Sequence, residues 1–505
     1  MEKVAVIDLG SNTARVIIAN VMESGYFYII DELKDNIRLG QDLEKDGNFL
    51  KPARIAQTIN TLKMFRKICD VHKVDKIFAY ATAAVRAARN QKGFLDEIEV
   101  TCGIKLQILT PEEEAQLVYI GAVNTMDVPR GLIVDIGGSS TELICYYRRN
   151  LWAQTTLPFG AITLTDLFKD GNFKPEERMQ KIKDYVTERL KKIQWLKQVE
   201  PDVQLVGVGG SFRNLGKISR QTSNYPIEIV HNYRISSQSF DSIYENIRHL
   251  NIDESKRIKG LSLQRADIFP SAIGAIKAIM EYMNFKEIIF SGNGLREGAL
   301  LRYTMPSTIE KPINDVLGYS LNNILYTHGA NVTHAEHVTN IALQLFKQLK
   351  VLHKLPRMYV KVLRVAAMLH DIGNNVKYHR HNHHSCYYIL NSNIYGIAHR
   401  DIVMAAYVAA CEKKSDININ ELIKYKDLLV EEDIEAIYKL GIILRLAESF
   451  DRCLNGAITG IVCDILGDSV IMKTESEADC SLEIKEASLA CGEFKRAFKK
   501  NLEIL

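Results

Sequence analysis

The chain has 505 residues, 47% of them hydrophobic and 25% charged, which is the composition of an ordinary soluble protein with room for two to four domains. Its 64 basic and 61 acidic residues leave a net charge of +3, so the chain as a whole has no strong positive electrostatic field that would attract nucleic acid. No apolar run is long enough to span a bilayer, and we expect neither a membrane segment nor a signal peptide. Nine scattered cysteines without a Cys-x-x-Cys pair predict free thiols in a reducing cytoplasm.

The first predicted element is a buried strand that ends in a turn of glycine and hydroxyl residues. Residues 4–13 read Val-Ala-Val-Ile-Asp-Leu-Gly-Ser-Asn-Thr. The carboxylate of Asp8 can hold a metal ion or position a water, and a glycine lets backbone N–H groups approach an anion closely. A single copy of this pattern fits a glycine-containing β-turn with a buried aspartate equally well.

A helix over residues 52–71 and a strand over 76–81 are predicted next, followed by a helix start that carries Arg86 and Arg89. Arginine at a helix N-terminus favours phosphate, although such pairs more often form a solvated helix face. After a strand over 106–109, Thr110 can cap a helix whose first turn holds three glutamates. These glutamates complement the helix dipole, and one of them could point into a cleft.

The strand and turn of residues 4–13 recur at residues 132–142, which read Leu-Ile-Val-Asp-Ile-Gly-Gly-Ser-Ser-Thr-Glu. Asp8 and Asp135 are 127 positions apart, a distance that indicates a duplicated domain rather than a solenoid. Two facing hairpins of this kind form a phosphate clamp across a cleft between domains.

The second half repeats the plan of the first. Strands are predicted over 151–157, 205–208 and 287–290, and helices over 174–197 and 268–283. Glycine clusters at 209–214 and 291–298 each follow a strand and open a helix, where α/β sheets bind ligands.

Composition shifts near residues 306–312, and ten of the 13 histidines fall between His328 and His399. This later region is helical in pattern, with predicted helices over 335–349, 359–369 and 434–450. The end of the chain, residues 460–505, alternates apolar and polar residues (including Leu482 and Ile484), which predicts a small sheet with a helix over 491–501.

At these motifs the chain resembles the exopolyphosphatase/guanosine pentaphosphate phosphohydrolase family, over essentially its full length. The resemblance implies duplicated ribonuclease-H-like domains of the sugar kinase, heat-shock-70 and actin superfamily (an actin-like α/β fold), then an α-helical HD-like domain and a small α+β piece. The corresponding domain bounds are 1–123, 124–305, 306–456 and 457–505.

The resemblance also implies magnesium-dependent hydrolysis of the terminal phosphoanhydride of inorganic polyphosphate or of pppGpp, by a cytoplasmic homodimer. Glu114 would deprotonate the attacking water, and Arg86 would hold the terminal phosphoryl group. Asp8, Asp135 and Glu142 would bind magnesium or support the water. The expected phosphate-binding residues are Ser11, Asn12, Thr13, Gly137, Gly138, Ser139, Ser140, Gly209, Gly210 and Ser211, with Lys377 and Arg380 in the helical domain.

The helical domain resembles the HD type at His337, at His370 and Asp371, at His384, and at the segment 444–452. Active HD phosphohydrolases hold a metal with two His and two Asp, but Glu448 stands where the later Asp is expected. We therefore expect no metal essential to activity in this domain. Its basic patch around Lys377 and Arg380 would guide long substrates and could equally be an exposed polar loop.

Three functions compete at this point. The first is an exopolyphosphatase, with pppGpp phosphohydrolase as its close alternative. The second is an ATP-driven kinase or chaperone of the same superfamily, against which the Glu112–Glu114 segment argues. The third is a non-catalytic sensor of polyphosphate or an alarmone, against which the intact set of Glu114, Arg86 and Asp135 argues.

Overall fold

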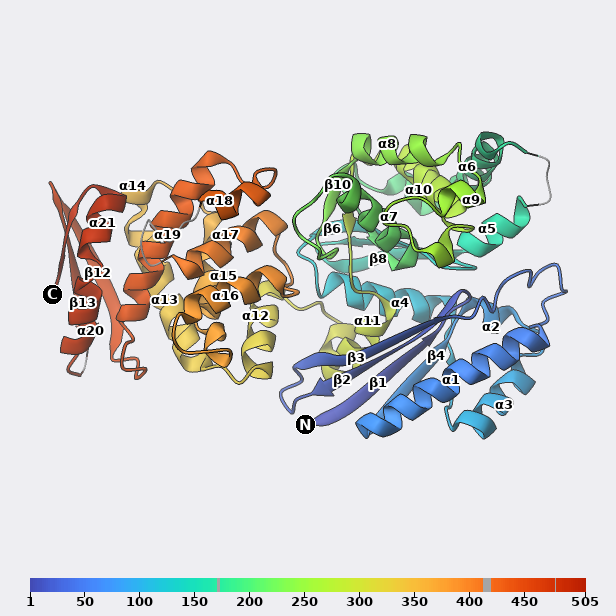
Figure 1. Cartoon of the computed structure of the whole chain (residues 1–505), viewed down its shortest axis with the longest axis horizontal. Helices are drawn as coiled ribbons and strands as arrows, with labels where there is room; N and C mark the ends of the chain where they lie inside the picture. Colours follow the sequence, from blue (N-terminus) through green and yellow to red (C-terminus); the bar gives the residue numbers. More distant parts are fainter. Residues whose placement is uncertain (170–172, 412–418, 477) are drawn as a thin grey trace. The chain divides into compact units, whose positions relative to one another are not determined.

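Two mixed β-sheets with the same strand order build the first of two units, which are Met1–Val316 and Leu317–Leu505 (Figure 1). The computed structural model describes residues 1–169, 173–411, 419–476 and 478–505. The first sheet has the order β3-β2-β1-β4-β5, and the second has β8-β7-β6-β9-β11 with β10 added at one edge. Their bounds are β1 (Glu2–Leu9), β2 (Thr13–Val21), β3 (Phe27–Asn36), β4 (Lys76–Ala81), β5 (Gln107–Ile108), β6 (Arg130–Ile136), β7 (Thr141–Tyr147), β8 (Asn150–Leu157), β9 (Gln204–Val208), β10 (Arg234–Ser236) and β11 (Glu287–Phe290).

The repeated motif occupies the opening hairpin of each sheet. β1 pairs antiparallel with β2 and parallel with β4, and β6 pairs in the same way with β7 and β9. Asp8 lies opposite Arg15 in the first hairpin, and Asp135 lies opposite Glu142 in the second. This topology confirms the predicted duplication of a ribonuclease-H-like, actin-like domain.

Helices cover both sheets and enclose two separate apolar cores, one for each sheet with its helices. We call these halves of the first unit lobe I and lobe II. Figure 1 shows α1 along one face of the first sheet with α3 beside it. The helices of this unit are α1 (Pro52–His72), α2 (Ala83–Ala87), α3 (Gln91–Cys102), α4 (Pro111–Val123), α5 (Ala161–Leu167), α6 (Pro175–Lys191), α7 (Gly209–Thr222), α8 (Ser237–Ile247), α9 (Ile252–Ser255), α10 (Phe269–Met283) and α11 (Leu295–Thr304), with 3₁₀ turns η1 (Gln194–Gln198), η2 (Leu263–Arg265) and η3 (Pro306–Ile309).

Helices α4 and α11 exchange places between the lobes. α4 follows the last strand of the first sheet but packs on β7 and β8 of the second, whereas α11 packs on β1 of the first. They meet where neither has a side chain: a Cβ on Gly121 would lie 2.1 Å from the carbonyl oxygen of Gly294, and a Cβ on Gly298 would lie 1.9 Å from that of Leu117. Only glycine allows backbones to approach this closely.

The first unit extends slightly past the predicted boundary at residue 305. The side-chain oxygen of Asn124, which is fully buried, accepts a hydrogen bond from the Ile313 amide at 2.7 Å. Arg149 donates to the Asn314 carbonyl. These contacts fasten residues 306–316 to the first unit, while the division into four domains stays a prediction.

The second unit is a group of helices with a small sheet after them. Its helices are α12 (Val316–Thr327, whose first residue closes the first unit), α13 (Val332–Gln348), α14 (Lys350–His353), α15 (Tyr359–Leu369), α16 (His381–Asn391), α17 (His399–Ala410), α18 (Ile419–Leu422), α19 (Glu431–Ser449), α20 (Ser481–Ser488) and α21 (Cys491–Phe498), with turns η4 (Ile372–Asn375) and η6 (Ile423–Tyr425). The sheet has the order β12-β13-β14, with β12 (Ile458–Leu466), β13 (Ser469–Ser476) and β14 (Asn501–Ile504).

Two sequence expectations differ from the structure. Leu482 and Ile484 lie on helix α20 rather than on a strand, since their two-residue spacing is too short to distinguish the two periods. The predicted helix over 174–197 ends at Lys191 and continues as the turn η1. All nine cysteines are free thiols, as predicted. None of the helices in the described ranges has the length and apolar character that a membrane span requires.

Candidate functional site

A cavity of about 110 Å³ lies between the two lobes, where the loops that follow β1, β6, β9 and β11 meet. This is the edge of the sheets at which α/β folds bind ligands. Twelve residues predicted from the sequence line it: Asp8, Ser11, Asn12, Thr13, Glu114, Asp135, Gly137, Gly138, Ser140, Glu142, Gly209 and Gly210. The structure therefore gathers most of the predicted site in one place.

Five predicted residues lie elsewhere. Arg86 and Ser139 line an adjoining pocket of about 750 Å³, which shares Ser140 with the cavity. Ser211 is fully buried, and its hydroxyl donates to the Ile136 carbonyl at 3.0 Å, so it supports the strand end rather than facing the cavity. Lys377 and Arg380 are exposed residues of the second unit.

The two glycine turns have the same internal hydrogen bond. The Gly10 amide donates to the Thr13 carbonyl and the Gly137 amide donates to the Ser140 carbonyl, both at 3.0 Å. The Gly137 amide, which the sequence assigned to phosphate, is thus occupied within its own turn. Gly138 has a different role: a Cβ there would lie 2.9 Å from Cβ of Ser11, so it lets the two turns approach each other.

Gly209 and Gly210 make room for charged side chains of the site. A Cβ on Gly209, whose φ is +83°, would lie 2.0 Å from Oδ1 of Asp135. A Cβ on Gly210 would lie 2.4 Å from the guanidinium of Arg265. The expected role of these glycines was direct phosphate binding, whereas in the structure they seat Asp135 and Arg265 against the first turn of α7.

Four side chains at or beside the cavity have buried polar atoms without a hydrogen-bond partner. These atoms are both amide atoms of Asn12, Nδ2 of Asn293, Oε1 of Glu142, which is only 2% exposed, and the hydroxyl of Ser139 in the adjoining pocket. Buried polar groups are nearly always paired, and an orphan at a cavity wall is typical of a group whose partner is a ligand or an ion.

The structure distinguishes the three glutamates that open α4. Glu113 forms a capping box, in which the Thr110 side chain accepts from the Glu113 amide and the Glu113 carboxylate accepts from the Thr110 amide. Glu112 is exposed. Glu114 is buried at the cavity, and its Oε2 accepts a hydrogen bond from Nη1 of Arg86 at 3.0 Å. The capped first turn thereby aims a single carboxylate inward.

Burial is the main cause that raises the carboxylate pKa values here. It raises the pKa of Glu114 to about 7, against the opposing charge of Arg86, and that of Asp135 to about 6, against Arg213. Burial, with Glu114 and Asp135 close by, raises the pKa of Glu142 well above its usual value. The pKa of Asp8 is also raised by burial. Four acidic groups in one cavity repel one another, and arginines that line the same cavity offset part of that repulsion.

Sequence reasoning missed four arginines that line the same cavity: Arg15, Arg213, Arg265 and Arg296. Burial and the charge of its neighbours lower the pKa of Arg15 to about 9 and that of Arg265 to about 10. Arg296 pairs with Glu32 at 2.8 Å. These guanidinium groups partly offset the carboxylates of Asp8 and Asp135, and their planar donors match phosphate oxygens, so the cavity suits a phosphate group.

The hairpin repeat could have revealed one of these arginines. Arg15 follows Asp8 by seven residues, as Glu142 follows Asp135, and the two occupy equivalent places in their hairpins. Arg213 and Arg296 each stand within a glycine cluster that the sequence singled out. Arg265 lies in the turn η2, where no motif marks it.

The donor set around the cavity fits a hard divalent cation. Asp8, Asp135 and Glu142 offer only oxygen, which Mg²⁺ prefers, and Glu142 has an unpartnered oxygen. Within the described ranges, groups of three or more candidate ligand atoms within 4.8 Å of one another occur only in the second unit, so Asp8, Asp135 and Glu142 are not gathered that closely. Mg²⁺ usually takes one or two protein carboxylates and completes its shell with water and substrate phosphate, which such widely spaced carboxylates allow.

Comparisons with known proteins identify a family for this chain. Residues 16–306 match the Ppx/GppA phosphatase family, and residues 318–491 match Ppx/GppA phosphatase, domain III. A guanosine-5'-triphosphate,3'-diphosphate pyrophosphatase of Aliivibrio fischeri is 29% identical over 391 residues, which are 76% of this chain and 75% of that protein.

Two solved structures resemble this chain over about three fifths of its length. The Ppx/GppA family member of Aquifex aeolicus is 28% identical with a TM-score of 0.52, over 61% of this chain and 98% of that one. An exopolyphosphatase from Cytophaga hutchinsonii is 25% identical with a TM-score of 0.56, over 60% of this chain and 98% of that one. With more than half of its length matched, the chain belongs to the Ppx/GppA phosphatase family.

Proposed function

We propose that the chain is an exopolyphosphatase, which releases terminal phosphate from inorganic polyphosphate by hydrolysis between lobes I and II. The observation that carries the proposal is Glu114, a buried carboxylate with a pKa of about 7 beside a small cavity rich in arginine. A general base works best when its pKa lies near the operating pH. Glu114 would accept the proton of the attacking water, and Arg86 would hold Glu114 and the phosphoryl group together.

The remaining residues supply charge and alignment, which are the main requirements of phosphoryl transfer. Arg15, Arg213 and Arg265 would bind the oxygens of the terminal phosphate groups, with the side chains of Asn12 and Ser140 as further donors. Asp8, Asp135 and Glu142 would hold magnesium, which neutralises the charge of the phosphoanhydride when bound. A cytoplasmic homodimer remains part of the proposal.

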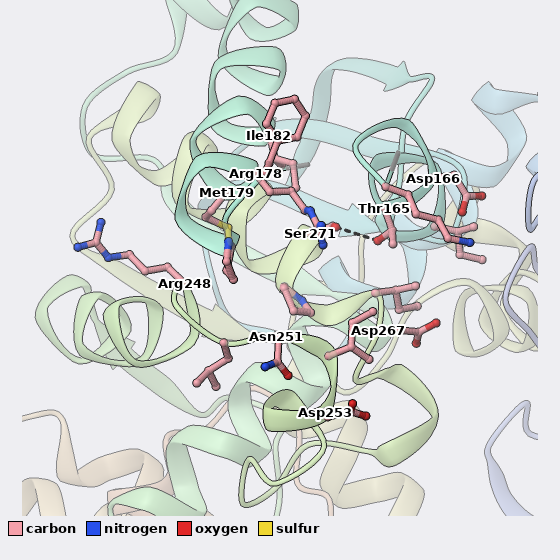
Figure 2. A pocket seen from close by; sticks show the side chains of 18 of the residues that line it. Thr165, Asp166, Arg178, Met179, Ile182, Arg248, Asn251, Asp253, Asp267 and Ser271 are labelled. Atoms are coloured by element: carbon pink, nitrogen blue, oxygen red, sulfur yellow. Dashed lines mark hydrogen bonds between the residues drawn. The ribbon is translucent and has the colours of Figure 1, made fainter. Parts of the chain in front are cut away.

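A second substrate, pppGpp, is supported by a different pocket, which is lined mostly by lobe II. Figure 2 shows this pocket of about 530 Å³, with side chains from α5, α6 and α10 and the hydrogen bond between Thr165 and Ser271 at 2.8 Å. Apolar Met179 and Ile182 stand beside Arg178, whose Nε is buried without a partner. A pocket of this size and mixed lining suits a nucleoside, and it shares Asn12 with the phosphate cavity.

The test compares phosphate release from long polyphosphate, pppGpp and ATP under one set of conditions, using kcat/KM. The proposal expects polyphosphate to exceed both nucleotides by at least about tenfold, which is about 1.4 kcal/mol of transition-state binding. The variant Arg178→Ala should leave polyphosphate hydrolysis unchanged, with Lys192→Ala, at the exposed C-cap of the same helix, as control. Preference for pppGpp, lost in Arg178→Ala but kept in Lys192→Ala, would replace polyphosphate by the nucleotide.

A further inference from the structure

A row of charged side chains crosses one face of the first sheet, from the phosphate cavity to the edge strand β3. Asp8 of β1 lies opposite Arg15 of β2, and Arg15 lies opposite Lys34 of β3. Residues opposite each other on neighbouring strands have their side chains on the same face of the sheet. Asp8 and Arg15 line the cavity, so Lys34 is the outermost member of a row that begins there.

The apolar core of lobe I lies on the opposite face of this sheet. Leu9 and Val16, which follow Asp8 and Arg15 in the sequence, belong to that core together with Phe65 of α1. Successive residues of a strand point to opposite faces, so the row faces away from α1. Lys34 is exposed, and within the described ranges its ammonium forms neither a hydrogen bond nor an ion pair. It is therefore available to a ligand that extends out of the cavity.

The second sheet has the same row with different residues. There Asp135 of β6 lies opposite Glu142 of β7, and Glu142 lies opposite Thr156 of β8. An acid and a hydroxyl thus stand where the first sheet has Arg15 and Lys34, although the strand order is the same. The fold does not require cations at these two positions, so their charge points to a ligand rather than to the packing of the hairpin.

The surroundings of Lys34 are mostly cationic. Partial burial is the largest cause that lowers the pKa of its ammonium to about 8, and the charges of three cavity arginines follow: Arg15, Arg265 and Arg213. Glu32, two residues away on the same strand, opposes them, but its carboxylate is shared with Arg296 at 2.8 Å and Arg15 at 3.9 Å. Like charges directly opposite each other destabilise a sheet. A local conflict of this kind is typical of a functional site.

The two larger pockets beside the cavity suit a chain of phosphates less well. The pocket of about 750 Å³ has Arg86 and Lys45 against four carboxylates, which repel a polyanion: Asp42, Glu44, Glu112 and Asp166. The pocket of about 530 Å³ is partly apolar, and Arg38 in its wall is already paired with Asp267 by two hydrogen bonds. A chain of phosphates has no apolar surface that such a pocket could bury.

We propose that Lys34 binds the phosphate groups that follow those in the cavity, so that a polyphosphate chain leaves the cavity across β2 and the edge strand β3. The cavity of about 110 Å³ has no room for the rest of such a chain. Neighbouring strands lie about 4.8 Å apart, so Lys34 serves the groups just beyond those that meet Arg15. The inference rests on the proposed function and adds to it a subsite for long, linear polyanions. Because this subsite lies outside the reacting centre, it should contribute to KM rather than to kcat.

The experiment measures kcat and KM of the full chain with tripolyphosphate and with long polyphosphate, at several salt concentrations. Lys34→Ala should raise KM for long polyphosphate about tenfold, near the lower end of what a hydrogen bond to a charged group contributes. Its kcat, and its KM for tripolyphosphate, should change by at most about twofold, as expected of a lost contact that acts on binding alone. The slope of log KM against log salt should fall by about one, the effect of losing a single contact to a polyanion.

Two further variants at the same position separate charge from packing. Lys34→Gln keeps the length of the side chain and removes its charge, so it should behave like Lys34→Ala, whereas Lys34→Arg should retain the wild-type KM. Lys63→Ala is the matched control, since Lys63 is an exposed lysine on α1, which covers the opposite face of the same sheet. Equilibrium binding of long polyphosphate to the Glu114→Gln form, with and without Lys34→Ala, gives the same comparison in the absence of turnover.

The outcomes distinguish the subsite from the proposed function. If the wild type hydrolyses polyphosphate, and Lys34→Ala has the same long-chain KM and the same salt slope, the subsite is overturned and the proposed function stands. A loss of kcat in Lys34→Ala with an unchanged KM would also overturn the subsite. If the wild type releases no phosphate from polyphosphate, the proposed function fails and the subsite fails with it.

Discussion

The substitution Glu114→Gln separates the chemical step from substrate binding. Glutamine keeps the size of the side chain and an oxygen that can accept from Arg86, whose Nη1 also donates to the Leu109 carbonyl at 2.6 Å. What disappears is the capacity to take a proton. Loss of a positioned base costs about 10²–10⁴-fold in rate. At 1.36 kcal/mol per tenfold, this is about 3–5 kcal/mol in the activation barrier.

Substrate binding should survive or improve, because the change removes one negative charge from a cavity that already holds Asp8, Asp135 and Glu142. The assay is phosphate release at saturating polyphosphate, together with equilibrium binding of polyphosphate to the variant. Glu112→Gln is the matched control, since that exposed carboxylate lies two positions away on the same helix turn. A Glu114→Gln rate within threefold of the wild type would refute the assignment of the base.

Three further outcomes are expected. In Arg86→Ala, loss of the charge that lowers the pKa of Glu114 should move the acidic limb of the rate profile above its wild-type position near pH 7, besides weakening substrate binding. Glu142→Gln should abolish activity, and in EDTA it should raise Tm at pH 8 but not at pH 4.5. The reason is that a carboxylate with a raised pKa stabilises the fold below its unfolded pKa and loses that contribution as pH rises, whereas glutamine does not ionise. A chain ending at Val316 should hydrolyse short polyphosphates normally but lose its preference for long ones, with a weaker dependence on salt.

Each outcome has its own control. Arg89→Ala removes an exposed arginine of the same segment and should leave the pH profile in place. Glu112→Gln should show no gain in Tm that depends on pH. For the shortened chain, the double variant Lys377→Ala and Arg380→Ala tests the basic patch in the full-length protein. Equal processivity of the shortened and full chains would remove the helical unit from substrate guidance.

The sequence predicted the fold of the first unit well because its signals are local. Strand β4 and strand β11 have the predicted bounds, and the repeated hairpin showed the duplication. The exchange of α4 and α11 between lobes could not be predicted, because periodicity tells which face of a helix is apolar but not which sheet it covers.

The sequence did not predict every residue of the site, for a similar reason. Arg265 reaches the phosphate cavity from a turn without a motif, by way of the space above Gly210. In the second unit, His334 and His337 are three residues apart on one helix, so spacing alone does not distinguish them. Nδ1 of His334 lies 2.7 Å from Oδ2 of Asp451, which accepts its hydrogen bond from far along the sequence. Spacing cannot predict a long-range contact of this kind.

The glycine crossing of α4 and α11 acts mechanically as a fulcrum. Helices in backbone contact at Gly121 and Gly298 cannot slide along each other, so the motion left to them is a swivel about that point. Glu114 lies seven residues from Gly121, about 10 Å along the axis, so a swivel of 10° displaces it by about 2 Å. Arg296 is nearer still, two residues from Gly298. Glu114, the proposed base, and Arg296 thus lie close to the pivot and move little, while the outer edges of the lobes travel furthest. A protein built this way can open its two lobes and keep the side chains of the cavity almost in register.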